Sequence, residues 1–325
     1  MADVVVTDYT FPNLDQERAA AEELGFSFAA HQCRSAEEVE RVLQGAKVGV
    51  VQFAPVSSDA IKGMDGGAAL IRYGIGFDNI DLPAANSRNI PVGYVPDYCV
   101  EEVAEHTCTL MLTQLRKVFE FDVSVRAGRW EAVSIASPMK AFANVKVGFF
   151  GFGQIGRAVH ERLKAFGFEF CVADPALSDV QARELGVEKV DATTLFAVAD
   201  AITLHAPVTP ETKHFVDANV LANMQSHAVL VNTSRGALID ECALADALND
   251  GQIAGAALDV FGVEPLPETS ELRAARGVIL SPHAAWYSED AIGKLQSLVA
   301  DDIRAHLSGQ ALRKPVPGST ACEGN

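Results

Sequence analysis

Three residues that could carry out acid–base and carboxylate-binding chemistry follow three short apolar runs in the second half of the chain. Arg235 follows AVLVNTS, Glu264 follows IAGAALDVFGV, and His283 follows GVILSP. If these runs are strands of one parallel sheet, the three side chains lie at the same edge, because the carboxyl ends of parallel strands meet there. A carboxylate beside an imidazole favours the imidazolium form, so Glu264 and His283 predict a proton donor. A guanidinium such as Arg235 can bind a substrate carboxylate through two parallel hydrogen bonds.

Each of these residues also has a purely structural interpretation. A single histidine between a proline and two alanines is often a partly buried structural group. An arginine at the end of a strand is often one half of a structural ion pair. Both interpretations stay open on these residues alone, and the choice depends on whether a cofactor site lies beside them.

A glycine-rich stretch, VKVGFFGFGQIGRAVHERLKAFG, predicts such a cofactor site. Gly151, Gly153 and Gly156 form the pattern G-x-G-x-x-G between an apolar strand, residues 147–150, and a helix, residues 155–166. The first glycine permits a tight turn, the second lets a pyrophosphate approach the backbone, and the third lets the helix pack on the strand. The helix N-terminus offers its N–H groups to the phosphate. A tight turn without a ligand is the alternative interpretation of this pattern.

Asp174 indicates which nucleotide this site takes. It ends the next predicted strand, FEFCVAD, and the residues after it, PALSD, contain no arginine. A carboxylate at this position accepts hydrogen bonds from both ribose hydroxyls of an adenosine and repels a 2′-phosphate, so we expect NAD rather than NADP. Beside a nicotinamide, the three polar residues suggest a reduction: hydride adds to a carbonyl carbon, His283 protonates the oxygen, and Arg235 holds the substrate carboxylate.

Composition narrows the class of protein. A chain of 325 residues with 49% hydrophobic residues predicts two well-filled domains. The net charge of −17 disfavours nucleic acids and anionic membranes as partners. The six cysteines form no C-x-x-C, and the histidines show no metal-ligand spacing, so we expect reduced thiols and no metal. The start, MADVVVTDYT, lacks a signal-peptide pattern, and no long apolar stretch is present, so we expect a cytoplasmic protein.

Short β-branched runs alternate with helical patterns, which predicts an α/β fold with parallel strands. One series runs from VVVTD to IPVGYV, and a second runs from KVGFF to GVIL. Between them, residues 100–128 predict one long helix that connects domains or forms a subunit contact. A last helix starts at Ser288, and its apolar face, which must pack on another element, consists of Ile292, Leu295, Val299, Ile303 and Leu307.

Several stretches together resemble the D-isomer-specific 2-hydroxyacid dehydrogenase family. They are GFFGFGQIGRAVHERLKAFG, LHAPVTPETKHFV, VNTSRGALIDECALADALNDGQIAGAALDVFGVEP and SPHAAW. In the first series, IRYGIGFDNIDLPAANSRNIPVGYVPDYCVEEVAEHT resembles the substrate-domain core and linker helix of the family. The run HAAWYSE is similar to the C-terminal-binding-protein branch, alongside bacterial relatives of the phosphoglycerate dehydrogenase-like kind.

The resemblance implies two doubly wound parallel-sheet domains, with a Rossmann NAD-binding domain inserted into a flavodoxin-like substrate domain. The substrate domain would take residues 1–98 and 289–325, and the NAD-binding domain would take residues 99–288. The resemblance also implies closure of the domains about a hinge. It further implies a homodimer formed through the cofactor domains and the linker region.

The resemblance implies roles for further residues beside the catalytic Arg235, Glu264 and His283. Cofactor contacts, apart from the three glycines and Asp174, would come from Thr107, Gln154, Ile155, Ala206, Pro207, Thr233, Ser234, Asp259 and His283, with Asp259 on the carboxamide side. Substrate contacts would come from Arg72, Tyr73, Gly74, Ile75, Arg235 and Trp286. Arg72 taken alone is also compatible with a solvated strand end.

We therefore expect an NAD-dependent oxidoreductase that transfers a hydride between NADH and a 2-oxo acid to give a D-2-hydroxy acid. Tyr73 and Trp286 favour a substrate pocket that tolerates apolar or aromatic groups. The alternative is an NAD(H)-sensing, corepressor-like dimer with little turnover. The branch resemblance supports this alternative, whereas the intact catalytic residues and the lack of a long C-terminal extension oppose it.

Overall fold

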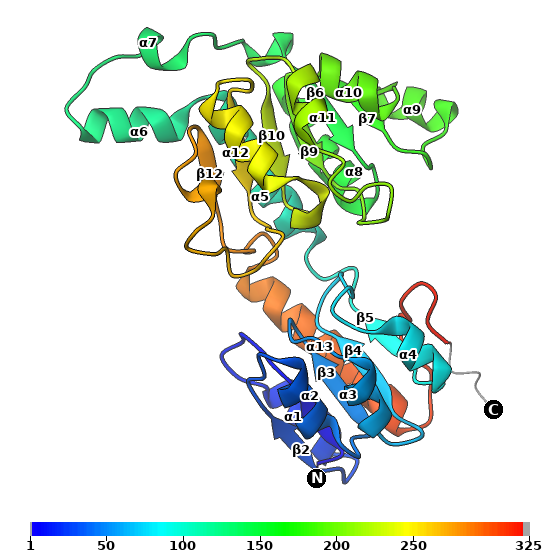
Figure 1. The fold of residues 1–325 in the computed structure, drawn as a ribbon. Helices are drawn as coiled ribbons and strands as arrows, with labels where there is room; N and C mark the ends of the chain where they lie inside the picture. The colour runs from blue at the N-terminus through cyan, green and yellow to red at the C-terminus, as the bar shows by residue number, and fades with distance from the viewer. Residues whose placement is uncertain (1, 321–325) are drawn as a thin grey trace. The chain divides into compact units, whose positions relative to one another are not determined.

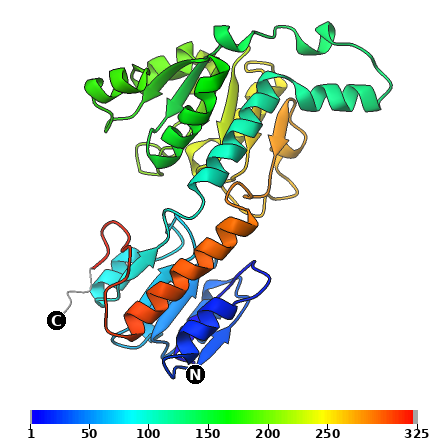
Figure 2. The ribbon, with the colours of Figure 1, turned by 180° about the vertical axis from the view of Figure 1, so that it is seen from behind.

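The computed structural model describes residues 2–320 and divides into two compact units, each with its own parallel sheet (Figure 1, Figure 2). One unit contains the described residues of Met1–Cys99 and Tyr287–Asn325, and the other contains Val100–Trp286. The chain thus leaves the first unit and returns to it with its last helix. The predicted fold class, two α/β domains with parallel sheets, is confirmed.

The first unit alternates strand and helix, and its last helix comes from the end of the chain. Its elements are β1 (Val4–Val6), α1 (Asp15–Glu22), β2 (Phe28–Ala30), α2 (Ala36–Leu43), β3 (Val48–Val51), α3 (Ser58–Gly63), β4 (Ala69–Arg72), α4 (Leu82–Ser87), β5 (Val92–Tyr94) and α13 (Glu289–Leu307). The sheet order is β2-β1-β3-β4-β5, the flavodoxin-like order, whose connections reverse direction between β1 and β3.

The apolar face of α13 packs within the first unit, as its sequence pattern requires. Ser288 caps this helix by accepting a hydrogen bond of 2.9 Å from the backbone N–H of Ala291. Leu295, Val299 and Ile303 are at most 1% exposed. The helix lies against α1, β3 and β4, and Figure 2 shows it, in orange, running along the sheet. Apolar side chains of α2, α3 and α4 form a core cluster with alternate residues of the strands.

The second unit is the larger of the two. Its elements are α5 (Val100–Leu115), α6 (Val118–Arg126), α7 (Val133–Ala136), η1 (Phe142–Asn144), β6 (Lys146–Phe150), α8 (Gln154–Leu163), η2 (Lys164–Phe166), β7 (Glu169–Ala173), α9 (Asp179–Leu185), β8 (Glu188–Lys189), α10 (Ala192–Val198), β9 (Ala201–Leu204), α11 (Ala218–Asn223), β10 (Val229–Asn232), η3 (Gly236–Leu238), α12 (Glu241–Asn249), β11 (Gly255–Leu258), η4 (Glu271–Arg273) and β12 (Val278–Leu280). The strand order is β12-β11-β10-β9-β6-β7-β8, with every pair parallel.

This order places the change of winding direction between β6 and β9, where open α/β sheets bind ligands at the carboxyl ends of the strands. Every residue of β9, β10 and β11 is buried, because helices cover both faces of the sheet. This double coverage explains why these strands appear in the sequence as continuous apolar runs rather than as alternating patterns.

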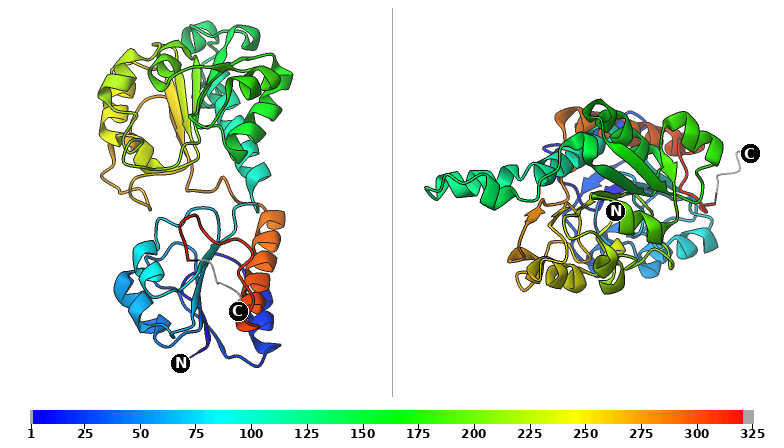
Figure 3. Two further views of the ribbon diagram at one scale, coloured as in Figure 1. Left: turned by 90° about the vertical axis from the view of Figure 1, so that its right-hand side faces the viewer. Right: turned by 90° about the horizontal axis from the view of Figure 1, so that it is seen from above.

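The predicted single helix over residues 100–128 is wrong. The structure has two helices, α5 and α6, separated at Lys117, whose φ of 53° is left-handed and cannot continue an α-helix. We call residues 118–136, which contain α6 and α7, the arm. Figure 3 shows the arm extending away from the rest of its own unit. Its exposed apolar side chains are Val118, Phe119, Val123, Val125, Trp130 and Val133.

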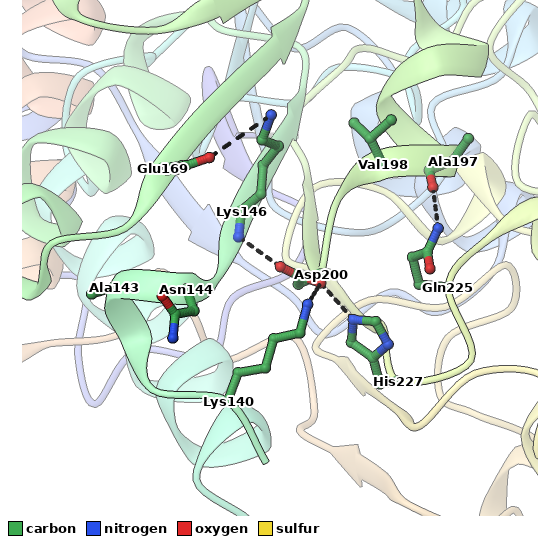
Figure 4. Close-up of a pocket in the computed structure, with 10 residues that line it drawn as sticks. All are labelled: Lys140, Ala143, Asn144, Lys146, Glu169, Ala197, Val198, Asp200, Gln225 and His227. Atoms are coloured by element: carbon green, nitrogen blue, oxygen red, sulfur yellow. Dashed lines mark hydrogen bonds and ion pairs between the residues drawn. The ribbon is translucent and has the colours of Figure 1, made fainter. Parts of the chain in front are cut away.

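A polar cluster lies at the amino ends of the strands of the second sheet, the edge opposite to their carboxyl ends (Figure 4). It lines a surface hollow of about 550 Å³ and is centred on Asp200, which is 6% exposed. Asp200 accepts hydrogen bonds from Lys140 Nζ at 2.8 Å, from the Lys146 N–H at 2.8 Å and from His227 Nε2 at 2.5 Å. Burial raises the pKa of Asp200, but these hydrogen bonds outweigh burial, so its net pKa is lowered. The three groups that donate to Asp200 all belong to the second unit itself, so we assign the cluster a structural role.

Five cysteines of the described chain are free thiols, of which four are buried and Cys242 is exposed. Cys322 lies outside the described residues. Across residues 2–320, no three His, Cys, Asp or Glu side chains are placed to hold a metal ion together. In the same part of the chain, no helix has both the length and the apolar character needed to cross a bilayer.

Candidate active site

The glycine motif forms a tight turn between β6 and α8 that only glycine permits. Gly151 has a φ of 89°, and a Cβ there would lie 2.5 Å from the backbone nitrogen of Ala206, which follows β9. A Cβ on Gly156 would lie 3.0 Å from the Gly151 carbonyl oxygen, so this glycine lets the helix approach the turn. Nothing lies within 4 Å of a Cβ at Gly153, and no side chain caps α8. The helix N-terminus with Gln154 and Ile155 therefore fits a phosphate group.

Asp174 follows β7 and lies directly beside the glycine turn. Its carboxylate accepts hydrogen bonds from the Phe152 N–H at 2.6 Å and from the Ala176 N–H at 2.7 Å. A carboxylate oxygen can accept more than one hydrogen bond, so this anchoring is compatible with ribose hydroxyls as further donors. The pair of features, a helix N-terminus and an oriented carboxylate, fits a dinucleotide such as NAD.

Thr107, Thr233 and Ser234 connect α5 and the ends of β9 and β10. Thr107 Oγ1 and Thr233 Oγ1 lie 2.7 Å apart, and both residues are buried. Ser234 Oγ donates to the carbonyl oxygen of Ala206 at 3.1 Å. Ala206 is buried, and the next residue, Pro207, is exposed. These contacts hold together the strand ends that border the glycine turn.

Arg235 leaves β10 in a segment that packs tightly against the chain after β11. Its Nη1 donates to the carbonyl oxygen of Ser234 at 2.7 Å. At the next position, a Cβ on Gly236 would lie 1.9 Å from the carbonyl carbon of Phe261 and 2.3 Å from the nitrogen of Gly262. Only a glycine lets these two backbones approach so closely, and the second of them leads directly to Glu264. The local sequence RG therefore brings the guanidinium and the carboxylate to the same edge.

Glu264 and His283 are joined by a hydrogen bond of 2.7 Å between Oε2 and Nδ1. The other carboxylate oxygen accepts from the Phe261 N–H at 2.9 Å. Burial raises the pKa of Glu264, but the hydrogen bond and charge of His283, together with the Phe261 N–H and the charge of Arg235, lower it by more, so the net pKa is lowered. The side chains of Glu264 and His283 keep 32% and 28% of their surface exposed.

Asp259 has a role that the sequence did not predict. The residue is fully buried, and its carboxylate accepts hydrogen bonds from Ser281 Oγ at 2.6 Å and from the N–H groups of Ala284 and Ala285, each at 2.9 Å. Its carbonyl oxygen accepts from the His283 N–H at 2.7 Å. Asp259 thus holds the loop that carries His283. Sequence reasoning also missed Ser281 and His106, because nothing local distinguishes them.

His205, which follows β9, makes contacts inside the second unit. Its Nε2 lies 3.0 Å from Thr203 Oγ1, and its ring stacks on Phe149. Burial lowers the pKa of His205 to about 3, so its ring is neutral at neutral pH.

The remaining candidate substrate residues, Arg72 to Ile75, belong to the first unit, while Trp286 ends the second. Arg72 ends β4, and its guanidinium lies over the ring of Phe53, 5.8 Å from the ring centroid. Gly74 has a φ of 118°, which lets the chain turn sharply after the strand.

The expectation that the Tyr73 ring lines an open substrate pocket is wrong. Tyr73 is 1% exposed, and its hydroxyl donates to Glu17 Oε1 on α1 at 2.9 Å. The ring packs edge-on against Phe11 at 5.0 Å between centroids. Side chains of successive strand residues point to opposite faces, and at the end of β4 this alternation directs Tyr73 into the core of its unit.

Comparison with known proteins shows the family of the chain. Residues 108–285 match the model of the D-isomer specific 2-hydroxyacid dehydrogenase NAD binding domain. A glyoxylate reductase of Korarchaeum cryptofilum is 35% identical over 258 residues, which cover 79% of this chain and 78% of that protein. A D-3-phosphoglycerate dehydrogenase of Methanocaldococcus jannaschii is 35% identical over 95% of this chain, which spans only 58% of that longer protein.

A solved structure supports the same assignment. The NADPH-dependent glyoxylate/hydroxypyruvate reductase of Sinorhizobium meliloti, in complex with NADP and malonate, superposes with a TM-score of 0.84. It is 28% identical in sequence, and the match covers 98% of this chain and 97% of that chain. The match to the NAD-binding domain model spans more than half of the chain and contains the glycine motif, Asp174, Arg235, Glu264 and His283. The chain therefore belongs to the D-isomer specific 2-hydroxyacid dehydrogenase family and is an NAD-dependent enzyme of that class.

Proposed function

We propose that this protein reduces a small 2-oxo acid to a D-2-hydroxy acid, reversibly, with Arg235, Glu264 and His283 as its catalytic residues. The observation that carries the proposal is the 2.7 Å pair of Glu264 and His283, in the same unit as Arg235 and the glycine turn. When bound, NADH supplies the hydride. Arg235 binds the substrate carboxylate and polarises the carbonyl. His283 donates a proton from Nε2 to the carbonyl oxygen, while Glu264 stabilises the imidazolium through Nδ1.

Two observations support a substrate class: the substrates for which the relatives are named, and the number of cationic side chains among the candidate substrate residues. The glyoxylate reductase and the glyoxylate/hydroxypyruvate reductase are named for small unphosphorylated oxo acids, whereas the phosphoglycerate dehydrogenase is named for a phosphorylated one. Among residues 72–75, Arg72 supplies the single cation, and a phosphate would require more. We propose that the first unit is the substrate domain and that glyoxylate, hydroxypyruvate and related unphosphorylated acids are substrates.

A panel of 2-oxo acids tests this proposal directly. The pure protein is mixed with NADH and, in turn, glyoxylate, hydroxypyruvate, pyruvate, branched and aromatic oxo acids, and 3-phosphohydroxypyruvate. We expect loss of NADH absorbance with at least one unphosphorylated acid. No turnover with any acid contradicts the reductase, and a higher kcat/KM for 3-phosphohydroxypyruvate than for the others contradicts the substrate class.

Replacing Asp174 with alanine is expected to lower kcat/KM for NADH by roughly 10-fold and to narrow the preference for NADH over NADPH. The reason is that the carboxylate holds two ribose hydroxyls and repels a 2′-phosphate. Steady-state kinetics with both cofactors provides the measurement. Asp174→Asn is the matched control, because its one carbonyl oxygen can keep the hydrogen bond from the Phe152 N–H or from the Ala176 N–H while the charge is removed. An unchanged NADH to NADPH ratio in both variants contradicts the assigned role.

We also propose that the protein is a homodimer in the cytoplasm. The apolar arm supports the dimer, since Trp130 is 90% exposed and Val133 is 80% exposed. Exposed apolar groups gathered on one projecting segment are typical of interaction surfaces. The buried free thiols Cys33, Cys99 and Cys108 favour a reducing compartment.

The double substitution Trp130→Glu with Val133→Glu is expected to convert the dimer to monomers, because it places two charges in the apolar contact. Light scattering coupled to size-exclusion chromatography measures the mass. Glu131→Gln is the control on the same exposed segment and should leave the dimer intact. A monomeric wild-type protein, or a dimer that the double substitution does not change, counts against this interface.

A further inference from the structure

A chain of hydrogen bonds connects the connector helix α5 to the loop that carries His283. His106 Nε2, on α5, lies 3.2 Å from Ser281 Oγ. Ser281 Oγ donates to Asp259 Oδ1 at 2.6 Å, and His106 Nε2 itself lies 3.7 Å from the same oxygen. The two oxygens of Asp259 then accept from the backbone N–H groups on the C-terminal side of His283. These residues all belong to the second unit.

The direction of these hydrogen bonds is determined by their chemistry. The backbone N–H groups of Ala284 and Ala285 can only donate, so the carboxylate of Asp259 accepts from them. The single hydroxyl proton of Ser281 goes to the same carboxylate, which leaves the oxygen of Ser281 as an acceptor toward His106. The contact between His106 and Ser281 is therefore a hydrogen bond donated by His106 Nε2–H. Both the imidazolium and the neutral ring protonated at Nε2 supply this donor.

The loop needs such support because His283 adopts an unfavourable backbone conformation. Its φ is 52°, in the left-handed region that non-glycine residues rarely adopt. Asp259 restrains the loop on both sides of this residue, through its carbonyl oxygen to the His283 N–H and through its carboxylate to Ala284 and Ala285. This backbone conformation directs Nδ1 of His283 toward Glu264.

We propose that His106 and Ser281 are positioning residues for His283. Their hydrogen bonds fix the rotation of the Asp259 carboxylate, and the carboxylate fixes the loop. His106 thus acts on catalysis from α5, through the two intermediate side chains Ser281 and Asp259. The inference rests on the proposed acid–base role of His283, and it adds that α5 contributes to the precision of that proton transfer.

The test compares His106→Leu, which removes the donor, with His106→Gln, whose side-chain amide can restore an N–H at similar reach. We expect His106→Leu to lower kcat by roughly 3- to 10-fold with little change in KM for NADH, since one neutral hydrogen bond is lost. His106→Gln should recover most of this loss. A merely structural role would lower the thermal stability of both variants without this difference in kcat. An unchanged kcat in His106→Leu overturns the proposal.

A double-mutant cycle with Ser281→Ala tests whether the two residues act in series. If they do, the double variant loses no more kcat than the larger of the two single losses, because either change releases Asp259. Independent losses that multiply would show that His106 and Ser281 act separately, which overturns the relay.

Hydrogen exchange gives a measurement that does not depend on turnover. We expect the amides of residues 283–285 to exchange faster in His106→Leu than in the wild type, with His106→Gln in between, because the loop opens more readily when its anchor rotates. Unchanged exchange overturns the positioning role even if the enzyme is active. Faster exchange in a protein that reduces no 2-oxo acid supports the relay and instead contradicts the proposed function.

Discussion

Replacing His283 with alanine is expected to lower kcat for 2-oxo acid reduction by roughly 10²- to 10⁴-fold, the range over which a positioned general acid contributes. The carbonyl oxygen gains a full negative charge unless a proton arrives as the hydride adds, and water would have to replace the imidazole. The effect should fall mainly on kcat, because Gly153 and Asp174, which we propose contact the phosphate and the ribose, are in other loops of the unit. Absorbance kinetics measures kcat, and NADH fluorescence measures binding.

The matched control is His227→Gln. His227 lies at the amino edge of the same sheet and contacts Asp200, away from the strand ends that carry the proposed catalytic residues. We expect this variant to keep its kcat, so a loss confined to His283 shows that the position matters and not merely the removal of a histidine.

The substitution His283→Ala also distinguishes the enzyme from the corepressor-like alternative. A sensor that works through NAD(H)-dependent assembly keeps its cofactor response when His283 is replaced, and it has little turnover to lose. If His283→Ala retains the wild-type kcat, or if the wild type shows no turnover that the substitution could abolish, the acid–base role is contradicted. No feature of the described structure favours the sensor over the enzyme, since the Glu264–His283 pair is intact.

The features that could be predicted from the sequence are those determined by local patterns. Gly151, Gly153 and Gly156 are recognisable because a strand and a helix flank them, and the same spacing dictates the turn. An aspartate directly before a helical pattern predicts an N-cap, and Asp240 caps α12 by accepting the Ala243 N–H at 3.1 Å. Arg235, Glu264 and His283 were proposed as site residues because each follows an apolar run that forms a strand, and parallel strands bring such positions together.

The features that could not be predicted depend on partners far apart in the sequence. The link from His106 to Ser281 spans 175 positions, and no periodicity relates them. The break at Lys117 is a single left-handed residue within a continuous apolar pattern, so periodicity passes over it. Residues with ordinary local settings acquire their roles only when the sheet register places them together.

Glu17 is another residue whose setting depends on a distant partner. The charged stretch ERAAAEELG predicts a mostly solvated helix face, yet Glu17 is fully buried and is contacted by the Tyr73 hydroxyl and by Gln296 Nε2. Burial raises the pKa of Glu17, with the hydrogen bonds opposing the shift. The return of α13 to the first unit covers this face of α1, because the two helices lie against each other. The burial of Glu17 therefore follows from the discontinuous topology and not from the composition of α1.

A second large effect is expected on stability, in mild acid. His160, on α8, is 1% exposed and lies among the rings of Phe149, Phe152 and Phe170, with centroids 4.6 to 6.1 Å away. Burial, aided by the charge of Lys164, lowers the pKa of His160 from 6.5 to about 4. In the unfolded chain the His160 imidazole therefore binds a proton below about pH 6.5. In the folded protein it binds that proton only below about pH 4.

The free energy of unfolding must fall across this interval, because the unfolded state binds more protons there. For His160 alone, the loss at pH 5 relative to pH 7 is about 2 kcal/mol, and it stops growing below about pH 4, where both states are protonated. His205, whose pKa burial lowers to about 3, acts in the same direction. Its contribution is smaller than the shift suggests, because part of the residue is exposed and water screens the charge.

Urea unfolding at pH 7 and pH 5 measures this loss, and the fluorescence of Trp130 and Trp286 reports on the second unit, which contains both tryptophans. His160→Phe should make the unfolding free energy less dependent on pH by about 2 kcal/mol over this interval, since it keeps an aromatic ring and removes the titrating group. His160→Leu serves if the phenyl ring is too large.

His214→Asn is the control, because His214 is exposed and asparagine tolerates its positive φ. The change in carboxylate repulsion with pH is common to all these proteins and cancels in the comparison. Equal pH dependence in the wild type and both His160 variants would show that the imidazole in this aromatic cluster is already solvated when it is protonated.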